Sequence, residues 1–218
     1  MLQQTQAPRV VAKYKEFLKN FPTIKTLAKA PLKKVVLVWQ GLGYNRRAVN
    51  LHRAAKAISK LRSFPKTKQA LINLSGIGST TAGDTLAFAF NKPEIVIETN
   101  IRTVFIHCFF KDKKSVHDKE ILPLIEKTLD KKNPREWYFA LMDYGASLKK
   151  TYSNPSRRSK HYAKQSPFKG SNRELRSKIL KYFLVYGKHP ATIVAKALSM
   201  PNEIVKNNIE KMKKEGLL

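Results

Sequence analysis

Two glycines and one carboxylate are spaced so that they could grip a phosphate and do chemistry beside it. Gly76 and Gly78 form a Gly-x-Gly turn, and Glu98 opens a Glu-Thr-Asn run about one helix length later. Glycine lets the backbone approach a phosphate closely, and a helix that starts after such a turn presents N–H groups to an anion. In a very basic chain, this pattern indicates chemistry on nucleic acid.

The charge of the chain points to the same class of partner. The 218 residues include 43 Lys and Arg against 15 Asp and Glu, a formal net charge of +28. We therefore expect a polyanionic partner, whose binding weakens steeply with salt. Few acids are available for chemistry in residues 1–110, namely Glu16, Asp84, Glu94 and Glu98.

The single cysteine limits both the cofactors and the compartment. With only Cys108, the sequence predicts no disulfide framework, no Cys-only metal site and no iron–sulfur cluster. Cys108 lies among apolar residues and is expected in the core. No apolar stretch reaches the roughly 20 residues of a membrane span, and residues 1–6 lack the features of a signal peptide. We expect a cytoplasmic, nucleoid-associated protein.

Apolar residues recur with helical spacing along nearly the whole chain, which predicts an all-α protein. The only strand-like run is the short stretch 94–97. We predict a core over 1–148, a basic linker or arm over 149–170, and a small helical unit over 171–218. In that last unit a short helix, a turn and a longer helix follow the helix-turn-helix plan. A three-helix cap on the main domain is the alternative.

Residues 1–150 resemble the helix-hairpin-helix DNA glycosylases of the endonuclease III superfamily. They are most similar to the adenine DNA glycosylases, which excise adenine mispaired with 8-oxoguanine. The resemblance implies a two-lobed helical core. The stretches that carry it are Met-Leu-Gln-Gln-Thr-Gln at 1–6, the Trp-Gln-Gly-Leu-Gly-Tyr segment within 39–52, the hairpin at 74–83 and the late helix at 140–146.

The resemblance implies double-stranded DNA as the partner and assigns DNA contacts to several of these residues. Gln4 and Tyr44 match the family's wedge positions, where a side chain fills the space of an extruded base. The alternatives are a surface amide for Gln4 and a turn tyrosine for Tyr44. The other predicted DNA contacts are Gly41, Gly43, Arg46, Arg47, Gly76, Gly78, Ser79, Thr80, Arg157 and Arg158.

The resemblance also assigns the chemistry. Glu98 falls on the family's catalytic Asp, where a carboxylate stabilises the oxocarbenium-like state of N-glycosidic cleavage. Asn100 matches a family Asn that could orient the sugar or the attacking water. The alternative for Glu98 is an acid that stabilises a helix N-terminus. Thr80 stands where bifunctional relatives carry a Schiff-base Lys, which implies a monofunctional enzyme. Asp84, one turn further on, is expected to be a solvated surface acid, and the alternative is a side chain that faces the pocket.

Three parts of the family pattern are missing from this sequence. The family's second acid, a Glu that protonates adenine, lies just before the segment at which this chain starts, so its catalysis is in doubt. We expect either a start at an internal Met of a longer gene or a short protein without that acid. The four-cysteine iron–sulfur loop and the 8-oxoguanine-recognition domain are also absent. A monovalent cation at the hairpin is the one expected bound ion.

The predicted function is monofunctional removal of adenine from A:8-oxoguanine or A:G mispairs by a monomer. Two other classes remain open. One is a non-catalytic, structure-specific DNA-binding protein that keeps the phosphate grip and the wedge. The other is a transcription regulator that works through 171–218.

Overall fold

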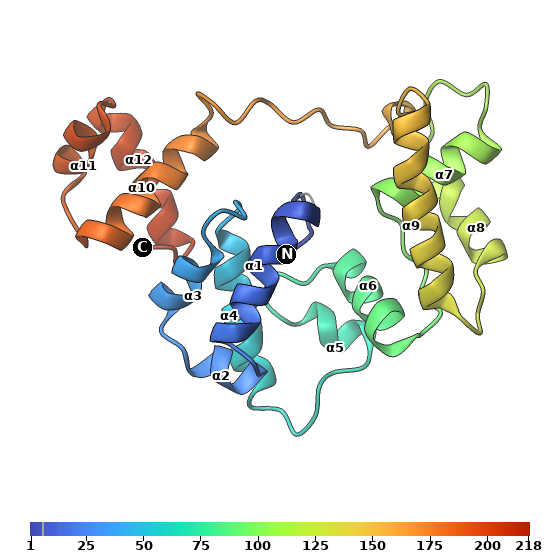
Figure 1. The fold of residues 1–218 in the computed structure, drawn as a ribbon, viewed down its shortest axis with the longest axis horizontal. Helices are drawn as coiled ribbons and strands as arrows, with labels where there is room; N and C mark the ends of the chain where they lie inside the picture. Colours follow the sequence, from blue (N-terminus) through green and yellow to red (C-terminus); the bar gives the residue numbers. More distant parts are fainter. Residues whose placement is uncertain (6) are drawn as a thin grey trace. The chain divides into compact units, whose positions relative to one another are not determined.

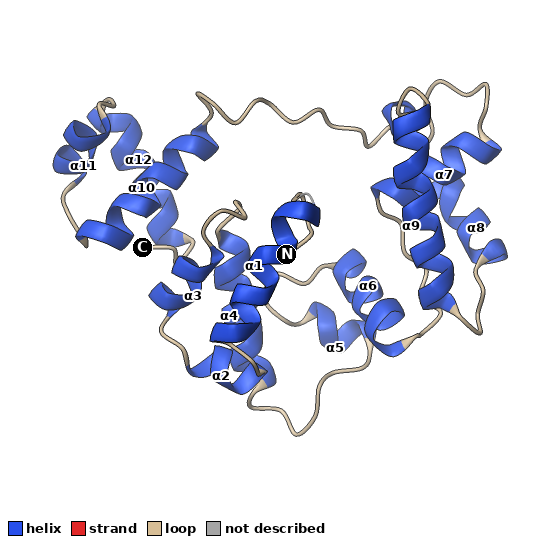
Figure 2. Cartoon of the chain, viewed as in Figure 1, coloured by secondary structure: helices blue, strands red, loops and turns tan. Residues whose placement is uncertain are grey.

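The computed structural model describes residues 1–5 and 7–218, and these residues form an all-α protein (Figures 1 and 2). No strand occurs among them, and the one isolated parallel bridge joins Val116 to Ser159. The run 94–97 is therefore extended without being part of a sheet. The all-α prediction is confirmed. By contact density the chain divides into two compact units, Met1–Phe64 with Ser166–Leu218, and Pro65–Gln165.

The first unit combines the N-terminal helices with the C-terminal ones. Its helices are α1 (Ala7–Asn20), α2 (Ile24–Lys29), α3 (Leu32–Trp39), α4 (Arg46–Ile58), α10 (Asn172–Tyr186), α11 (Ala191–Leu198) and α12 (Asn202–Lys214). One hydrophobic core joins them, because the fully buried Val35 and Ala48 belong to the same cluster as Ile179 and Val205. Figure 1 shows the last three helices, orange to red, beside α3. The short helix, turn and longer helix expected near the C-terminus are present as α11 and α12.

The second unit contains the Gly-x-Gly hairpin and Glu98. Its helices are α5 (Lys68–Ile72), α6 (Ser79–Phe90), α7 (Thr99–Phe109), α8 (Asp118–Thr128), α9 (Pro134–Thr151) and the short 3-10 helix η1 (Pro155–Arg158). A separate core of aliphatic and aromatic side chains holds these helices together, including Ile101, Ile121 and Tyr138, all fully buried.

The start of the predicted basic arm is a packed part of this second unit. Helix α9 continues to Thr151, and Ser156 is buried. The backbone of Val116 donates to Arg158 O at 2.8 Å and accepts from Lys160 N at 2.8 Å. The arm boundaries at 149 and 170 therefore coincide with no unit boundary of the structure. Residues 161–170 are exposed throughout, in keeping with a polar connecting segment.

Arg158 explains why the chain packs there instead of remaining an arm. Its guanidinium donates to the carbonyl oxygens of Ile106 (3.2 Å), Lys111 (2.7 Å) and Lys113 (3.2 Å), and to that of Phe110. These groups surround the C-terminus of α7, where a cation satisfies unpaired carbonyls. This guanidinium therefore stabilises the fold, while Arg157 beside it is exposed. The DNA contacts predicted for both residues stay predictions.

Two glycines let the helices of the second unit approach the chain on either side of the α7 N-terminus. At Gly83 in α6, a Cβ would lie 3.1 Å from Val96 Cγ2. At Gly145 in α9, it would lie 2.8 Å from the carbonyl carbon of Asn100 and would clash with the carbonyl oxygen. Tyr138 completes the clamp, because its hydroxyl accepts from Val96 N at 2.9 Å and donates to the carbonyl of residue 94 at 2.7 Å.

We predict that Gly145→Ala destabilises the protein. Alanine gains about 1 kcal/mol in helix propensity, but overpacking against a fixed backbone costs about 1–3 kcal/mol or more. The free energy of unfolding in urea should fall by about 1–2 kcal/mol. Gly83→Ala is the matched control, and it should lose less because the Val96 side chain can move aside. A Gly145→Ala protein as stable as Gly83→Ala would show that the close approach does not constrain the fold.

Candidate active site

The hairpin between α5 and α6 has the helix–turn–helix-start geometry that the sequence predicts. Gly76 has φ of +75°, a conformation that favours glycine. Gly78 is the N-cap of α6 with φ of −94° and gives the helix no side-chain cap. A Cβ at Gly78 would meet nothing within 4 Å, so the protein itself does not require glycine there. Ser79 and Thr80 are exposed at the helix start. These features fit an anion-binding helix N-terminus.

Monovalent cations bind oxygen ligands such as backbone carbonyls, and the hairpin offers carbonyls of this kind. The carbonyls of Leu71 and Leu74 each accept a backbone N–H, from Leu74 at 3.0 Å and Ile77 at 3.2 Å. Each carbonyl oxygen has a second lone pair. The cation at this turn stays a prediction.

Glu98 is the N-cap of α7, and its carboxylate is held by the helix start. Oε1 accepts from Asn100 N at 2.5 Å and from Ile101 N at 2.8 Å. The first turn of α7 contains no other acid, so this carboxylate alone faces the positive end of the helix dipole. The side chain is half-buried. The helix-end role foreseen as an alternative is therefore present, and it also fixes the carboxylate in place. The catalytic role stays a prediction.

Asn100 is oriented by a lysine that the sequence analysis did not single out. Lys149 Nζ donates to Asn100 Oδ1 at 2.6 Å. Burial lowers the pKa of Lys149, while the charge of Glu98 acts in the opposite direction. Because the amide oxygen accepts from the ammonium, the amide NH2 group is left to donate elsewhere. The available signal was the spacing from Gly145 to Lys149, which is one helical turn on the face that touches Asn100.

Asp84 is a half-buried carboxylate near Glu98, and the expectation of a solvated surface acid is wrong. Burial raises the pKa of Asp84 to about 6, and the negative charge of Glu98 adds to this effect. Among the described residues, Asp84 has no hydrogen-bond or ion-pair partner. The preceding residue, Gly83, packs directly on Val96, so this turn of α6 faces the protein interior.

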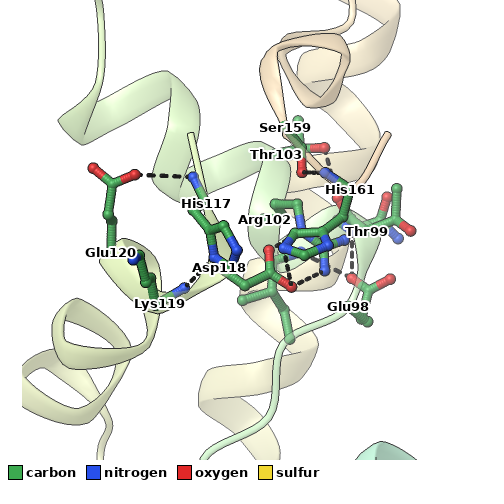
Figure 3. Close-up of polar contacts among 12 residues, drawn as sticks. Glu98, Thr99, Arg102, Thr103, His117, Asp118, Lys119, Glu120, Ser159 and His161 are labelled. Atoms are coloured by element: carbon green, nitrogen blue, oxygen red, sulfur yellow. Dashed lines mark hydrogen bonds and ion pairs between the residues drawn. The ribbon is translucent and has the colours of Figure 1, made fainter. Parts of the chain in front are cut away.

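A second polar cluster lies one turn along α7 from Glu98 (Figure 3). Arg102 binds Asp118 through two hydrogen bonds of 2.7 Å and so ties α7 to the start of α8. Burial raises the pKa of Asp118, but the hydrogen bonds and charge of Arg102 outweigh it and leave the pKa below its usual value. His161 Nε2 lies 3.9 Å from the same carboxylate, and its ring lies 4.6 Å from that of His117. This cluster holds the chain around the α7 N-terminus.

Within residues 1–5 and 7–218, no group of three or more His, Cys, Asp or Glu side chains is placed to hold a metal ion. The helices of that part of the chain are too short or too polar for any of them to cross a membrane. Cys108 is exposed, so its expected place in the core is wrong. It lies in the last turn of α7, next to the exposed Phe109.

The predicted wedge residues lie in the other unit and share an unusual backbone. Gln4 and Tyr44 are exposed and have φ of 54° and 47°, a region that non-glycine residues rarely adopt. The neighbouring Gly41 and Gly43 have φ of 93° and 70°. Such strain often marks functional sites. Tyr44 also lies near Arg173, with its hydroxyl accepting from the guanidinium at 3.3 Å.

Arg47 connects the N-terminal residues to the loop that carries Tyr44. Its guanidinium donates to the carbonyls of Met1 (2.8 Å), Gln3 (2.5 Å), Leu42 (3.0 Å) and Gly43 (3.1 Å), and to Thr5 Oγ1 (2.9 Å). It therefore ties the N-terminal turn to the loop before Tyr44. The direct DNA contacts predicted for Arg46, which is exposed, and for the half-buried Arg47 stay predictions.

We predict that Asp84→Asn stabilises the protein at neutral pH. The pKa of Asp84 is raised from 3.8 to about 6 in the folded protein. The protonated Asp84 carboxyl therefore contributes its full share to the free energy of unfolding below pH 4. This contribution is lost as the pH rises through 6 and the carboxyl ionises. At pH 7.5 the variant should be about 1–2 kcal/mol more stable in urea unfolding, after allowing for partial exposure. The difference should disappear near pH 4.

Asp143→Asn is the control, since Asp143 is exposed on α9. Its stability should follow that of the wild type at both pH values. An Asp84→Asn protein that is less stable than the wild type at pH 7.5 would contradict the raised pKa.

Comparison with known proteins agrees with this geometry. The profile of the HhH-GPD superfamily base excision DNA repair proteins matches residues 1–130. Adenine DNA glycosylase of Buchnera aphidicola subsp. Baizongia pistaciae is 37% identical over 154 residues, which cover 68% of this chain and 43% of the relative. The human adenine DNA glycosylase is 31% identical over 154 residues, 68% of this chain and 28% of the relative. The chain thus spans less than half the length of these curated relatives.

Solved structures share the fold. A thermostable thymine-DNA glycosylase superposes with a TM-score of 0.56 at 21% identity, over 66% of this chain and 69% of that one. Endonuclease III in a trapped covalent intermediate with DNA superposes with a TM-score of 0.52 at 21% identity, over 77% of this chain and 73% of that one. From the profile match and the relatives together, this chain belongs to the HhH-GPD superfamily of base excision DNA repair proteins.

Proposed function

We propose that this protein is a DNA glycosylase that removes adenine mispaired with 8-oxoguanine or guanine. The observation that carries the proposal is the carboxylate of Glu98, held by two N–H groups of α7 beside an oriented Asn100. The relatives at 31–37% identity are named adenine DNA glycosylases, which supports adenine as the base.

The chemistry follows from the charge that develops at the sugar. When the C1′–N9 bond breaks, its electron pair leaves with the base, and positive charge forms at C1′ and the ring oxygen. A fixed carboxylate such as Glu98 stabilises this charge without having to reorganise. The NH2 group of Asn100 can orient the sugar or the water that adds to C1′. Thr80 offers a hydroxyl instead of an amine, so the hairpin forms no Schiff base and the reaction is monofunctional.

DNA binding would use surfaces on both units. The N-terminus of α6 with Gly76 and Gly78 would take a phosphate, and the net charge of +28 would add salt-dependent affinity. Extrusion of the base costs a few kcal/mol. Tyr44 and Gln4, both exposed, would fill the space it leaves. We propose a monomer that acts on duplex DNA in the nucleoid without an iron–sulfur cluster, with a monovalent cation at the hairpin.

The proposal predicts single-turnover excision on duplexes with A opposite 8-oxoguanine or G, with abasic sites revealed by alkali. Glu98→Gln should slow excision by about 10²–10³-fold, because it removes the charge that faces the sugar cation. Asp143→Asn is the matched acid control and should keep the wild-type rate. A duplex with A opposite T tests whether the mispair is required.

Other outcomes would select the other functions. Tight, salt-sensitive binding to the same duplexes without cleavage would make the protein a non-catalytic, structure-specific DNA-binding protein. Selective binding to one palindromic sequence through α11 and α12 would make it a transcription regulator.

A second prediction tests the phosphate grip without touching the chemistry. Gly78→Ser should leave thermal stability unchanged or slightly higher, because serine is a good N-cap and the added Cβ has open space. The same Cβ should keep a phosphate away from the helix N-terminus. The Kd for duplex DNA should rise about tenfold, equivalent to about 1.4 kcal/mol.

Thr67→Ser is the control, since Thr67 is the N-cap of α5 in the same hairpin and keeps its hydroxyl. It should bind DNA as the wild type does. Unchanged affinity in Gly78→Ser would exclude close contact between this turn and the DNA backbone.

A further inference from the structure

Asp84 differs from every other carboxylate that is shielded from solvent in the described part of the chain. The others have partners in the fold: Glu94 with Lys68, Glu98 with the α7 N-terminus, Asp118 with Arg102, Glu120 with Lys113, Glu174 with Lys178 and Glu215 with Arg176. Asp84 has neither a cation nor a hydrogen-bond donor. In a chain with 43 Lys and Arg, a half-buried acid without a cation needs an explanation.

Its position relates it to both parts of the candidate active site. Asp84 follows Thr80 by one turn of α6, so the two side chains share a face and are about 6 Å apart along the helix. The start of the same helix is the proposed phosphate grip. On its other side, the contact of Gly83 with Val96 places this turn against the segment that leads into Glu98.

We propose that Asp84 is a second catalytic carboxyl, which donates a proton to the departing adenine while Glu98 stabilises the sugar cation. This inference rests on the proposed glycosylase function and adds a residue and a step to it.

The proton balance of the step is complete. The Asp84 carboxyl gives its proton to a ring nitrogen of adenine, and the C1′–N9 electron pair leaves with the base. A water oxygen then bonds to C1′ and releases one proton, which restores the Asp84 carboxyl. The net reaction consumes one water and yields adenine and an abasic sugar.

The surroundings of the two acids favour this division of roles. Oε1 of Glu98 accepts two N–H groups at a helix N-terminus, so the positive end of the helix dipole faces this carboxylate. Asp84 has no donor, and burial with the charge of Glu98 raises its pKa to about 6. Unequal environments for two carboxyl groups are how hydrolases assign an acid and a charge stabiliser.

The other charged groups of the neighbouring helices do not reverse this assignment. From α9, burial raises the pKa of Tyr138 to about 12, so it stays neutral near Asp84. Lys149 on α9 and Arg102 on α7 are paired with Asn100 and Asp118. Glu94, before α7, is paired with Lys68.

The test is the pH dependence of single-turnover excision on A opposite 8-oxoguanine, for wild type, Asp84→Asn, Asp84→Glu and Asp143→Asn. A proton donor of this kind typically contributes about 10²–10⁴-fold. The wild-type rate should fall as the pH rises above about 6. Asp84→Asn should be at least about 100-fold slower at pH 6 and should lack that inflection. Asp84→Glu should recover part of the rate, and Asp143→Asn should match the wild type.

The outcomes separate this inference from the proposed function. Excision by Asp84→Asn with the wild-type rate and pH profile overturns the role of Asp84 and leaves the glycosylase intact. No excision by the wild type overturns both. A wild-type rate that rises through pH 6, lost in Asp84→Asn, assigns Asp84 as a proton acceptor and overturns its role as donor. Thermal unfolding of each variant, measured alongside, shows that a lost rate is not a lost fold.

Discussion

The candidate active site depends on how closely two helices approach the chain around the N-terminus of α7. Gly83 of α6 and Gly145 of α9 remove the side chains that would otherwise separate these helices from the extended segment 94–98 and from the first turn of α7, respectively. Tyr138 then satisfies the backbone of that segment, which has no sheet to pair with. The segment enters α7 in a fixed place, and Glu98 is its last residue before the helix. The position of the carboxylate is therefore set by backbone packing on both sides.

The acids of the candidate site differ from the other shielded acids in how their charge is compensated. A chain of +28 has a surplus of cations, and most of its shielded acids are neutralised by them. The acids of the candidate site follow a different rule. Glu98 is stabilised by backbone N–H groups, and Asp84 is left without a counter-ion. A counter-ion at Glu98 would weaken the attraction of its carboxylate for a sugar cation, and a counter-ion at Asp84 would lower the pKa of a carboxyl proposed to hold a proton. Lys149 is close to Glu98 but is directed to the amide of Asn100.

Local sequence signals predicted the parts of the molecule that depend on local physics. The helices follow the apolar period, the hairpin follows its glycines, and Glu98 lies at a helix start as its spacing from the hairpin suggested. The missed features depend on contacts between residues far apart in the chain. Asp84 was expected in solvent because the fit of Gly83 on Val96 is not visible in a helical pattern. The carbonyl contacts of Arg47 and Arg158 were not foreseen, since nothing local shows that each arginine organises a set of carbonyls. The DNA contacts predicted for the two residues stay predictions. The tail was separated from the core because its shared apolar cluster joins residues more than a hundred positions apart.

A glutamate at the N-cap of α7 is the feature of this site most in need of a physical account. Short side chains are the usual N-caps because they reach the helix N–H groups with little loss of freedom. Glutamate has one more rotatable bond, so a free Glu98 would sample several positions and stabilise a sugar cation poorly. Here both hydrogen bonds go to Oε1, which fixes the end of the side chain. The longer side chain consequently curls back to the helix. A carboxylate held in this way keeps the pre-organisation that a shorter acid would supply. The extra methylene then changes where the charge is presented but not how firmly it is held.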